Sequence, residues 1–376
     1  AGSLSVKTDS LMKAETTLTP SAGGVSTGMI NIKVNTATAI LSATNSAKIN
    51  GAGTLTVYGD VYVEAQGTAL AKAATRDPVL DVGILTIAAN VSTATLAAVQ
   101  TASINSVTLT EVDNLTVKSL FNVDQNDGAL ARLGGNGTAS VSISLIEVRA
   151  NAATATANAS STASISGSAI TASGLLTIVS SGTSHALATV KQANGTLSLA
   201  GIGITNLFAY ANGTFTASLD TTGVTVHADA ISISNTYHAR AEALALPPNG
   251  GLGGIDISGL AVKLNIATAV TNSSATAGIL GTGTVETTHD LAIRVTGTAH
   301  ADAQIPSSML SVSGVSIVAN VATATVSASQ TASIVNSTIK AGGDLEVVSI
   351  LNRTAAVNMS TGWARATTGS TGGNVS

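Results

Sequence analysis

A block of fifteen residues recurs six times along this chain, and it constrains the fold more than any other feature. Each copy alternates small residues and closes on an aliphatic one, as in NVSTATLAAVQTASI at Asn90–Ile104 and NVATATVSASQTASI at Asn320–Ile334. The other copies begin at Asn35, Asn151, Thr205 and Asn265. Successive blocks end 55, 61, 54, 60 and 55 residues apart. A fixed period in this range is typical of stacked-repeat architectures.

The alternation within each block predicts a β-strand, because side chains on a strand point to opposite faces in turn. One face carries small apolar residues, so we expect it to be buried as a ladder. Its alanines are Ala39, Ala94, Ala155, Ala209, Ala269 and Ala324, followed eight residues later by Ala47, Ala102, Ala163, Ala217, Ala277 and Ala332. The other face is rich in Thr and Ser, and its candidate surface ladder is Thr38, Thr93, Thr154, Thr268 and Thr323, broken by Phe208.

A second element follows each block. It is a short strand, a turn and then an Asp before alternating aliphatic residues, with a Gly-Asp corner at Gly59-Asp60 and Gly343-Asp344; the copy at Gly174-Leu175 lacks the Asp. We expect the glycine to supply a positive φ and the aspartate to cap the turn. Segments rich in Gly and Pro then vary in length between repeats and are predicted to be surface loops. They cover residues 77–83, 124–137, 192–201, 244–254 and 304–314.

These patterns predict an all-β fold: a parallel β-solenoid (β-helix) of six repeats of about 57 residues, with wide coils and no helices of note. Two or three narrow coils per repeat, or an antiparallel sandwich of repeated hairpins, remain alternatives. The whole chain, 1–376, is expected to be a single elongated repeat domain. Its repeats cover approximately 30–83, 84–145, 146–200, 201–258, 259–314 and 315–376, with 1–29 as the end of a preceding partial repeat.

The amino-acid composition narrows the classes of function that this protein can have. Only 10% of residues are charged, the formal net charge is -4, and there is no cysteine. Disulfides and thiolate metal sites are therefore excluded, and the scarcity of Lys and Arg argues against nucleic acid as a partner. No apolar run is long enough to span a membrane. Acidic groups are scattered and no G-x-S-x-G motif occurs, so we expect no enzyme and no catalytic residues.

Five residues are weak candidates for metal binding. His185, His238 and His300 fall at similar places in three successive repeats and would form a column if each repeat is one coil. Asp124 and Asp127 lie in a segment that partly resembles a calcium loop, although the distal Glu is missing. We predict no cofactor, with loosely bound calcium as the one candidate.

The corner at Ser337–Ser349, STIKAGGDLEVVS, together with the alternating blocks, resembles large filamentous bacterial surface adhesins of the leukotoxin and filamentous-haemagglutinin type. The resemblance implies a secreted or surface-displayed β-solenoid that extends, adheres or assembles. No secretion domain, cap or transporter segment of that family is present in this sequence.

The sequence therefore favours a non-enzymatic structural or adhesive extracellular repeat protein that forms a rigid rod or a self-assembling filament on or outside the cell. The expected partners are further copies or repeats of the same protein, or a host or surface ligand, because uncapped repeat ends can pair with one another. The alternative is a binding module that uses the Thr/Ser ladder face for ice or glycan.

Overall fold

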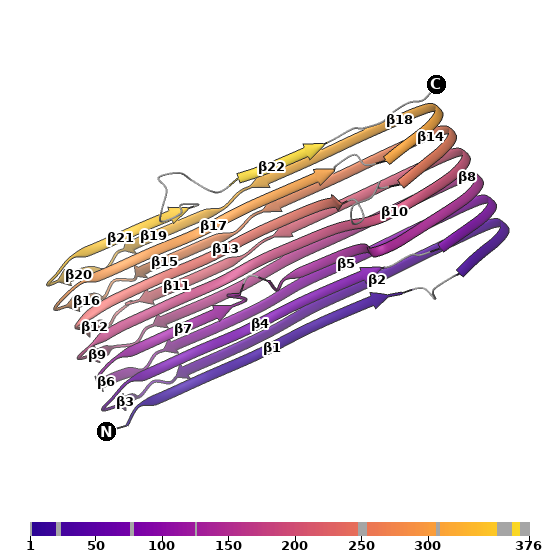
Figure 1. Cartoon of the computed structure of the whole chain (residues 1–376). Helices are drawn as coiled ribbons and strands as arrows, with labels where there is room; N and C mark the ends of the chain where they lie inside the picture. The colour runs from indigo at the N-terminus through magenta and orange to yellow at the C-terminus, as the bar shows by residue number, and fades with distance from the viewer. Residues whose placement is uncertain are drawn as a thin grey trace.

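The computed structural model describes residues 2–19, 24–75, 79–124, 126–246, 254–305, 309–351 and 363–368. Within these ranges the chain forms β-strands and no helix, and every strand pairing is parallel (Figure 1). The prediction of an all-β chain of parallel, stacked strands is confirmed. The antiparallel sandwich of hairpins is excluded, since neighbouring strands run in the same direction.

The strands fall into three groups that follow one another in each repeat. The first group, called the block face, contains the fifteen-residue blocks. Its strands are β2 (Gly24–Asn50), β5 (Val79–Asn105), β8 (Ala129–Ser166), β10 (Leu175–Ala211), β11 (Thr214–Asp220), β14 (Gly254–Thr271), β15 (Ser274–Leu280), β18 (Met309–Val326) and β19 (Ser329–Val335).

The second group is a narrow six-stranded sheet of short strands. They are β3 (Thr54–Thr56), β6 (Thr108–Val112), β9 (Ile170–Ala172), β12 (Thr225–Ala228), β16 (Thr284–Thr287) and β20 (Thr338–Ala341). The third group, the return face, also includes the first parts of β8 and β10. Its other strands are β1 (Leu4–Leu18), β4 (Val61–Thr75), β7 (Leu115–Phe121), β13 (Ala230–Leu246), β17 (Leu291–Ile305), β21 (Leu345–Leu351) and β22 (Trp363–Thr368).

Each strand pairs with its counterpart about one repeat further along the chain. Asn35 is opposite Asn90, and Asn90 is opposite Asn151. The amide side chains of these three residues form a ladder, with Nδ2–Oδ1 distances of 2.9 and 3.1 Å. Equivalent positions of the repeat therefore lie in straight columns along the stack.

The core lies between the block face and the return face. The alanines at both block positions point inward; those of the four central copies are fully buried, while Ala324 and Ala332 at one end are only partly buried. Small side chains let the two faces approach closely, and a few buried amides cross the gap. Gln100 donates to the carbonyl of Leu120 (3.1 Å), and Asn235 donates to that of Phe215 (2.7 Å). These bonds fix the two faces against each other, since a buried amide without a partner is costly.

The Gly-Asp corner differs from the prediction. Gly174 and Gly343 do not have positive φ, whereas several residues at the other corner do, among them Ser106 (φ 55°) and Asn336 (φ 61°). At Gly343 the absence of a side chain matters because the chain approaches the preceding repeat closely. A Cβ at Gly343 would lie 2.3 Å from Oδ1 of Asp290.

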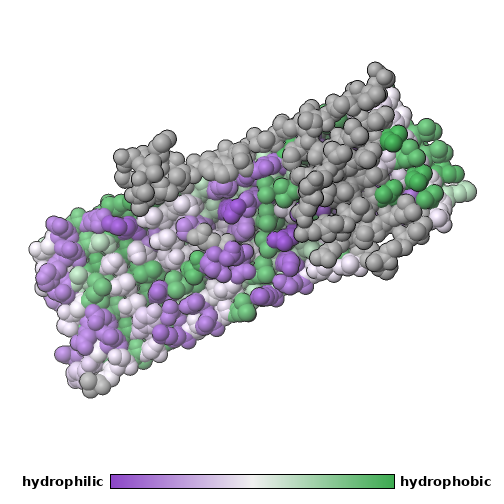
Figure 2. Space-filling model, in the orientation of Figure 1, coloured by the Kyte–Doolittle hydropathy of each residue, from purple (hydrophilic) through white to green (hydrophobic). Residues whose placement is uncertain are grey.

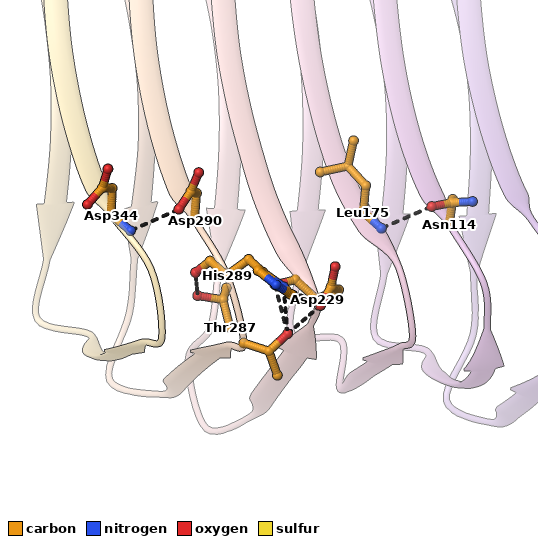
Figure 3. A network of polar contacts seen from close by, with 8 residues as sticks. Asn114, Leu175, Asp229, Thr287, His289, Asp290 and Asp344 are labelled. Atoms are coloured by element: carbon orange, nitrogen blue, oxygen red, sulfur yellow. Dashed lines mark hydrogen bonds and ion pairs between the residues drawn. The ribbon is translucent and has the colours of Figure 1, made fainter.

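The capping role of the corner carboxylates reaches across repeats rather than within one turn. Oδ1 of Asp290 accepts the backbone N–H of Asp344 (2.9 Å), and Oδ1 of Asn114 accepts that of Leu175 (3.0 Å), as Figure 3 shows. Asp229 stands one residue earlier and instead binds the ring Nδ1 of His289 (2.7 Å). Each corner is thus tied to the next one along the stack.

The segments predicted to be loops are largely strands. β5, β8, β14 and β18 begin within or just after these segments, and β10 runs through one of them. All five strands curl around one side of the stack before entering the blocks (Figure 1). Their glycines and serines suggested turns, but backbone pairing between repeats continues through them. We call this curled part the bend. It consists of residues 27–34, 82–89, 143–150, 197–204, 257–264 and 312–319.

Candidate functional site

The candidate Thr ladder lies on the outward side of the block face. Register pairing places Thr38, Thr93 and Thr154 in one column, which passes through Phe208 to Thr268 and Thr323. The two end threonines are exposed and the three between them are half-buried. Hydroxyl groups therefore recur about every 4.8 Å along the stack.

A second hydroxyl column runs parallel to the first on the same face, eight residues further along each repeat. It contains Ser46, Thr101, Thr162, Thr216, Thr276 and Thr331. The two columns make the outward block face a regular array of hydroxyl and methyl groups with few charges. Such an array can bind a repetitive ligand through many weak contacts, and it can also contact a like surface.

The three histidines do not form one column, so that prediction is wrong. His185 and His300 flank Arg240, whereas His238 is opposite Thr298, two residues further back on the strand. Nδ1 of His238 lies 2.8 Å from the hydroxyl of Thr298, and burial lowers the pKa of His238. Among the described residues, no three His, Asp or Glu side chains are grouped as a metal site would need.

Glu242 is the centre of a polar cluster on the return face. Its carboxylate is 3.3 Å from Nε2 of His185 and 2.5 Å from Nη2 of Arg240, and the side chain is 9% exposed. Burial alone would raise the pKa of Glu242, but hydrogen bonds from His185 and Arg240 hold it below its usual value. The cluster contains one ion pair and one histidine contact. Such a buried polar network stabilises and orients the strands that carry it.

Asp124 and Asp127 lie in a short insertion between β7 and β8. Burial, and then the carboxylate of Asp124, raise the pKa of Asp127, while Lys13 opposes this. The insertion begins at Asn122, whose amide accepts the N–H of Ala69 (2.7 Å) and donates to its carbonyl (3.0 Å). Asn122 thereby replaces a missing backbone partner in the ladder. Gln125 lies outside the described residues, and the two aspartates remain a weak calcium candidate.

The two ends of the stack present equivalent sets of strands. One end consists of β1, β2 and β3; the other consists of β18 with β19, β20, and β21 with β22. Within the described part of the chain, each of these strands has a paired neighbour on one side only. Core residues such as Leu55 and Ile339 are only partly buried there. Both ends therefore combine free backbone edges with exposed core side chains, a surface suited to pairing with another strand layer.

The direction of the free amides at one end follows from the observed bonds. The N–H of Leu4 donates to the carbonyl of Asp60, just before β4, and that of Gly51 donates to the carbonyl of Asn105, the last residue of β5. Since alternate residues of a strand direct their N–H groups to opposite sides, the amides of Leu11 and Ile40 point to the free edge. Both side chains are exposed and lie outside the core.

Sequence reasoning missed the bend, where the usual polarity of the fold is reversed. Several inward-facing residues there are polar: Lys33 pairs with the buried Asp81, just before the bend, and Glu147 pairs with Arg149. The outward residues are aliphatic and exposed, and they form the apolar end of the surface in Figure 2. Alternating aliphatics such as Val141, Ile143 and Leu145 carried this signal. The sequence of a single strand, however, did not indicate which of its two faces would be buried.

The chain matches no protein-family model, no curated protein and no solved structure. Across the described residues it has no helix that could cross a membrane.

Proposed function

We propose that this chain is a non-enzymatic structural protein of the cell surface or extracellular space. In this proposal it is a β-solenoid of six wide coils, one per repeat, that extends by stacking end on end with further copies or further repeats. The observation that carries the proposal is the equivalence of the two ends. β1, β2 and β3 supply the same three groups, return face, block face and narrow sheet, as the strands at the opposite end.

The columns of the stack support continuation across such a joint. A following layer would place Asn35 beside Asn320 and Thr38 beside Thr323, which extends the amide and hydroxyl columns. At the corner, Ser3 would meet Asp344, whose counterpart Asp290 already caps a backbone amide. Lys7 would approach Glu346, which pairs with Arg294 on its other side (2.6 Å). Charge, hydrogen bonding and core composition are all compatible with joining the ends.

The test blocks one end without disturbing the core. Leu11→Pro combined with Ile40→Pro removes two free-edge N–H groups, and edge strands tolerate proline. We expect wild type to form filaments with a strand spacing of about 4.8 Å along the axis, and the proline variant to form only short particles. Electron microscopy and sedimentation would measure the lengths.

The matched control is Leu11→Thr with Ile40→Thr, which makes the same sites polar but keeps both N–H groups. It should assemble like wild type. Wild type that stays as single particles at high concentration, or a proline variant whose filaments are unchanged, would contradict end-to-end assembly.

A second candidate function rests on the hydroxyl columns of the block face. The outward-facing, regularly spaced threonines favour a role in binding ice or glycan. Phe208 interrupts the first column, so Phe208→Thr should complete it and strengthen binding several-fold. Ice-recrystallisation and glycan-binding assays of the two proteins would decide this, and equal activity, or none in either, would count against the binding module.

A further inference from the structure

The bend carries a continuous aliphatic surface on the outside of the molecule. One outward column contains Ile30, Leu85, Ile146, Ala200, Leu260 and Val315. The next contains Ile32, Ile87, Val148, Ile202, Val262 and Ile317. No charged residue and no Trp or Tyr occurs in either column. Figure 2 shows these side chains gathered at one end of the molecule.

The most exposed part of this surface is an apex column that lies outside the pairing register. Gly28 pairs with Gly83 and Ile30 with Leu85, so Met29 and Ile84 stand unpaired between them. The same residue is skipped in every strand of the bend. The apex column therefore runs Met29, Ile84, Leu145, Leu199, Gly259 and Gly314.

Large and absent side chains divide the apex column into a ridge and a recess. Met29, Ile84, Leu145 and Leu199 are 73%, 49%, 48% and 66% exposed, which makes them a ridge. Gly259 and Gly314 continue the column without side chains. A two-fold axis at the middle of the column would set Met29 against Gly314, Ile84 against Gly259, and Leu145 against Leu199. The surface is therefore self-complementary in the way that an isologous interface requires.

We propose that the bend is an interface through which two copies of this chain pack side by side with their stacks antiparallel. Both copies carry side-chain rows at the same spacing of about 4.8 Å, so ridges and grooves match along the whole contact. The exposed aliphatic area is on the order of 1,000 Å², above the roughly 800 Å² per partner of a standard interface. It also exceeds the apolar patches usual on monomers.

A lipid bilayer fits this surface less well than a second copy. Proteins that bind a membrane surface place Lys, Arg, Trp or Tyr around their apolar residues. The outward columns of the bend contain none of these. Its cations Lys33, Arg149 and Lys263 share a different column, in which Lys33 and Arg149 pair with carboxylates. Side-by-side pairing is separate from end-to-end stacking, because the bend lies along the stack and the free edges lie at its ends.

The experiment uses the proline variant that blocks the ends, so that only side-by-side pairing remains. Sedimentation should show a dimer at micromolar concentration. Adding Leu145→Arg, which buries a charge at the centre of the interface, should weaken dimerisation at least tenfold. Val99→Lys is the matched control: Val99 is 41% exposed on the block face, away from the bend, and its change should have no effect.

Cysteine cross-linking tests the antiparallel geometry, since the chain has no cysteine of its own. Ile84→Cys with Leu260→Cys should give a disulfide-linked dimer on oxidation. Within one chain these residues are three strands apart, about 14 Å, which is too far for a disulfide. Ile84→Cys alone should not cross-link.

A monomer at all concentrations, or a dimer indifferent to Leu145→Arg, would overturn the proposal. Equal cross-linking by Ile84→Cys alone would overturn the antiparallel arrangement. Flotation of monomeric protein with phosphatidylcholine vesicles, abolished by Leu145→Arg, would assign the bend to lipid instead. Filament length, scored separately in the Leu11→Pro and Ile40→Pro experiment, reports on end-to-end stacking alone.

Discussion

At the scale of single residues, several buried amide side chains have partners that fix the chain in one register. Gln100 and Asn235 cross the core to backbone carbonyls, and Asn90 bonds to Asn35 and Asn151 in the strands beside it. A core made of alanine alone would tolerate shifts in strand register, because every alanine side chain has the same size and shape. These amides and the Glu242 cluster add the specificity that small apolar side chains lack.

Replacing Glu242 by Gln should change how stability depends on pH. The pKa of Glu242 is lowered in the folded state, so its contribution is present above the unfolded value near 4.5 and is lost as pH falls through the lower folded pKa. We expect Glu242→Gln to be about 1–3 kcal/mol less stable at pH 7, with the difference shrinking below pH 4. Urea unfolding of both proteins at pH 7, 5 and 3.5 measures it. A difference that stays constant over this range would contradict the assignment.

At the scale of elements, strands and corners are specified by different means. Strands follow from alternation and stack in register, whereas corners depend on contacts with the preceding repeat. Gly174 illustrates this, since a Cβ there would lie 2.5 Å from Oδ1 of Asn114, the atom that caps Leu175.

Gly174→Ala should therefore destabilise the fold by about 1–3 kcal/mol, because the new methyl group displaces the capping amide. Gly203→Ala is the comparison: its nearest neighbour would be Cγ of Lys263 at 3.7 Å, an ordinary contact. That change should be neutral, or stabilising by up to about 1 kcal/mol. Thermal unfolding of the two variants would separate steric crowding from a general intolerance of alanine.

Asn122→Ala should destabilise the protein at the insertion between β7 and β8. It leaves the N–H and carbonyl of Ala69 without their partner and places alanine at a φ of 46°. We expect a loss of about 2–4 kcal/mol and faster amide exchange in β4. Asn122→Asp, which can still accept the N–H of Ala69, should lose less. Equal losses in the two variants would mean that the amide is not acting as a backbone substitute.

The elements also mark the limit of what the sequence predicts. Alternation within the blocks was enough to predict strands, and equal spacing was enough to predict their stacking. The histidine column failed because His185 and His238 are 53 residues apart while the register there advances by 55. The prediction of loops at the bend failed because glycine and serine indicate turns when a segment is considered alone. Only pairing with the next repeat keeps these residues extended.

At the scale of the whole molecule, each layer makes its backbone pairings with adjacent layers, so we expect each part of the stack to depend mainly on the layers beside it for its stability. Deleting residues 315–376 should leave amide protection in β5, β7 and β8 unchanged within about threefold, while β14, β15 and β17 lose protection as the new end. Hydrogen exchange with mass spectrometry measures both. Uniform loss of protection throughout the chain would show a single cooperative unit instead.

The one-repeat offset between paired strands also determines how the molecule would respond to force. The chain enters at β1 and its last described strand, β22, lies at the opposite end of the stack (Figure 1). Tension between these ends acts along the inter-strand hydrogen bonds and opens them in succession. Each detached layer lengthens the molecule from about 4.8 Å to about 200 Å of extended polypeptide. A molecule held at both ends would therefore extend in long, separate steps, and each step would dissipate energy while the remaining layers stay folded.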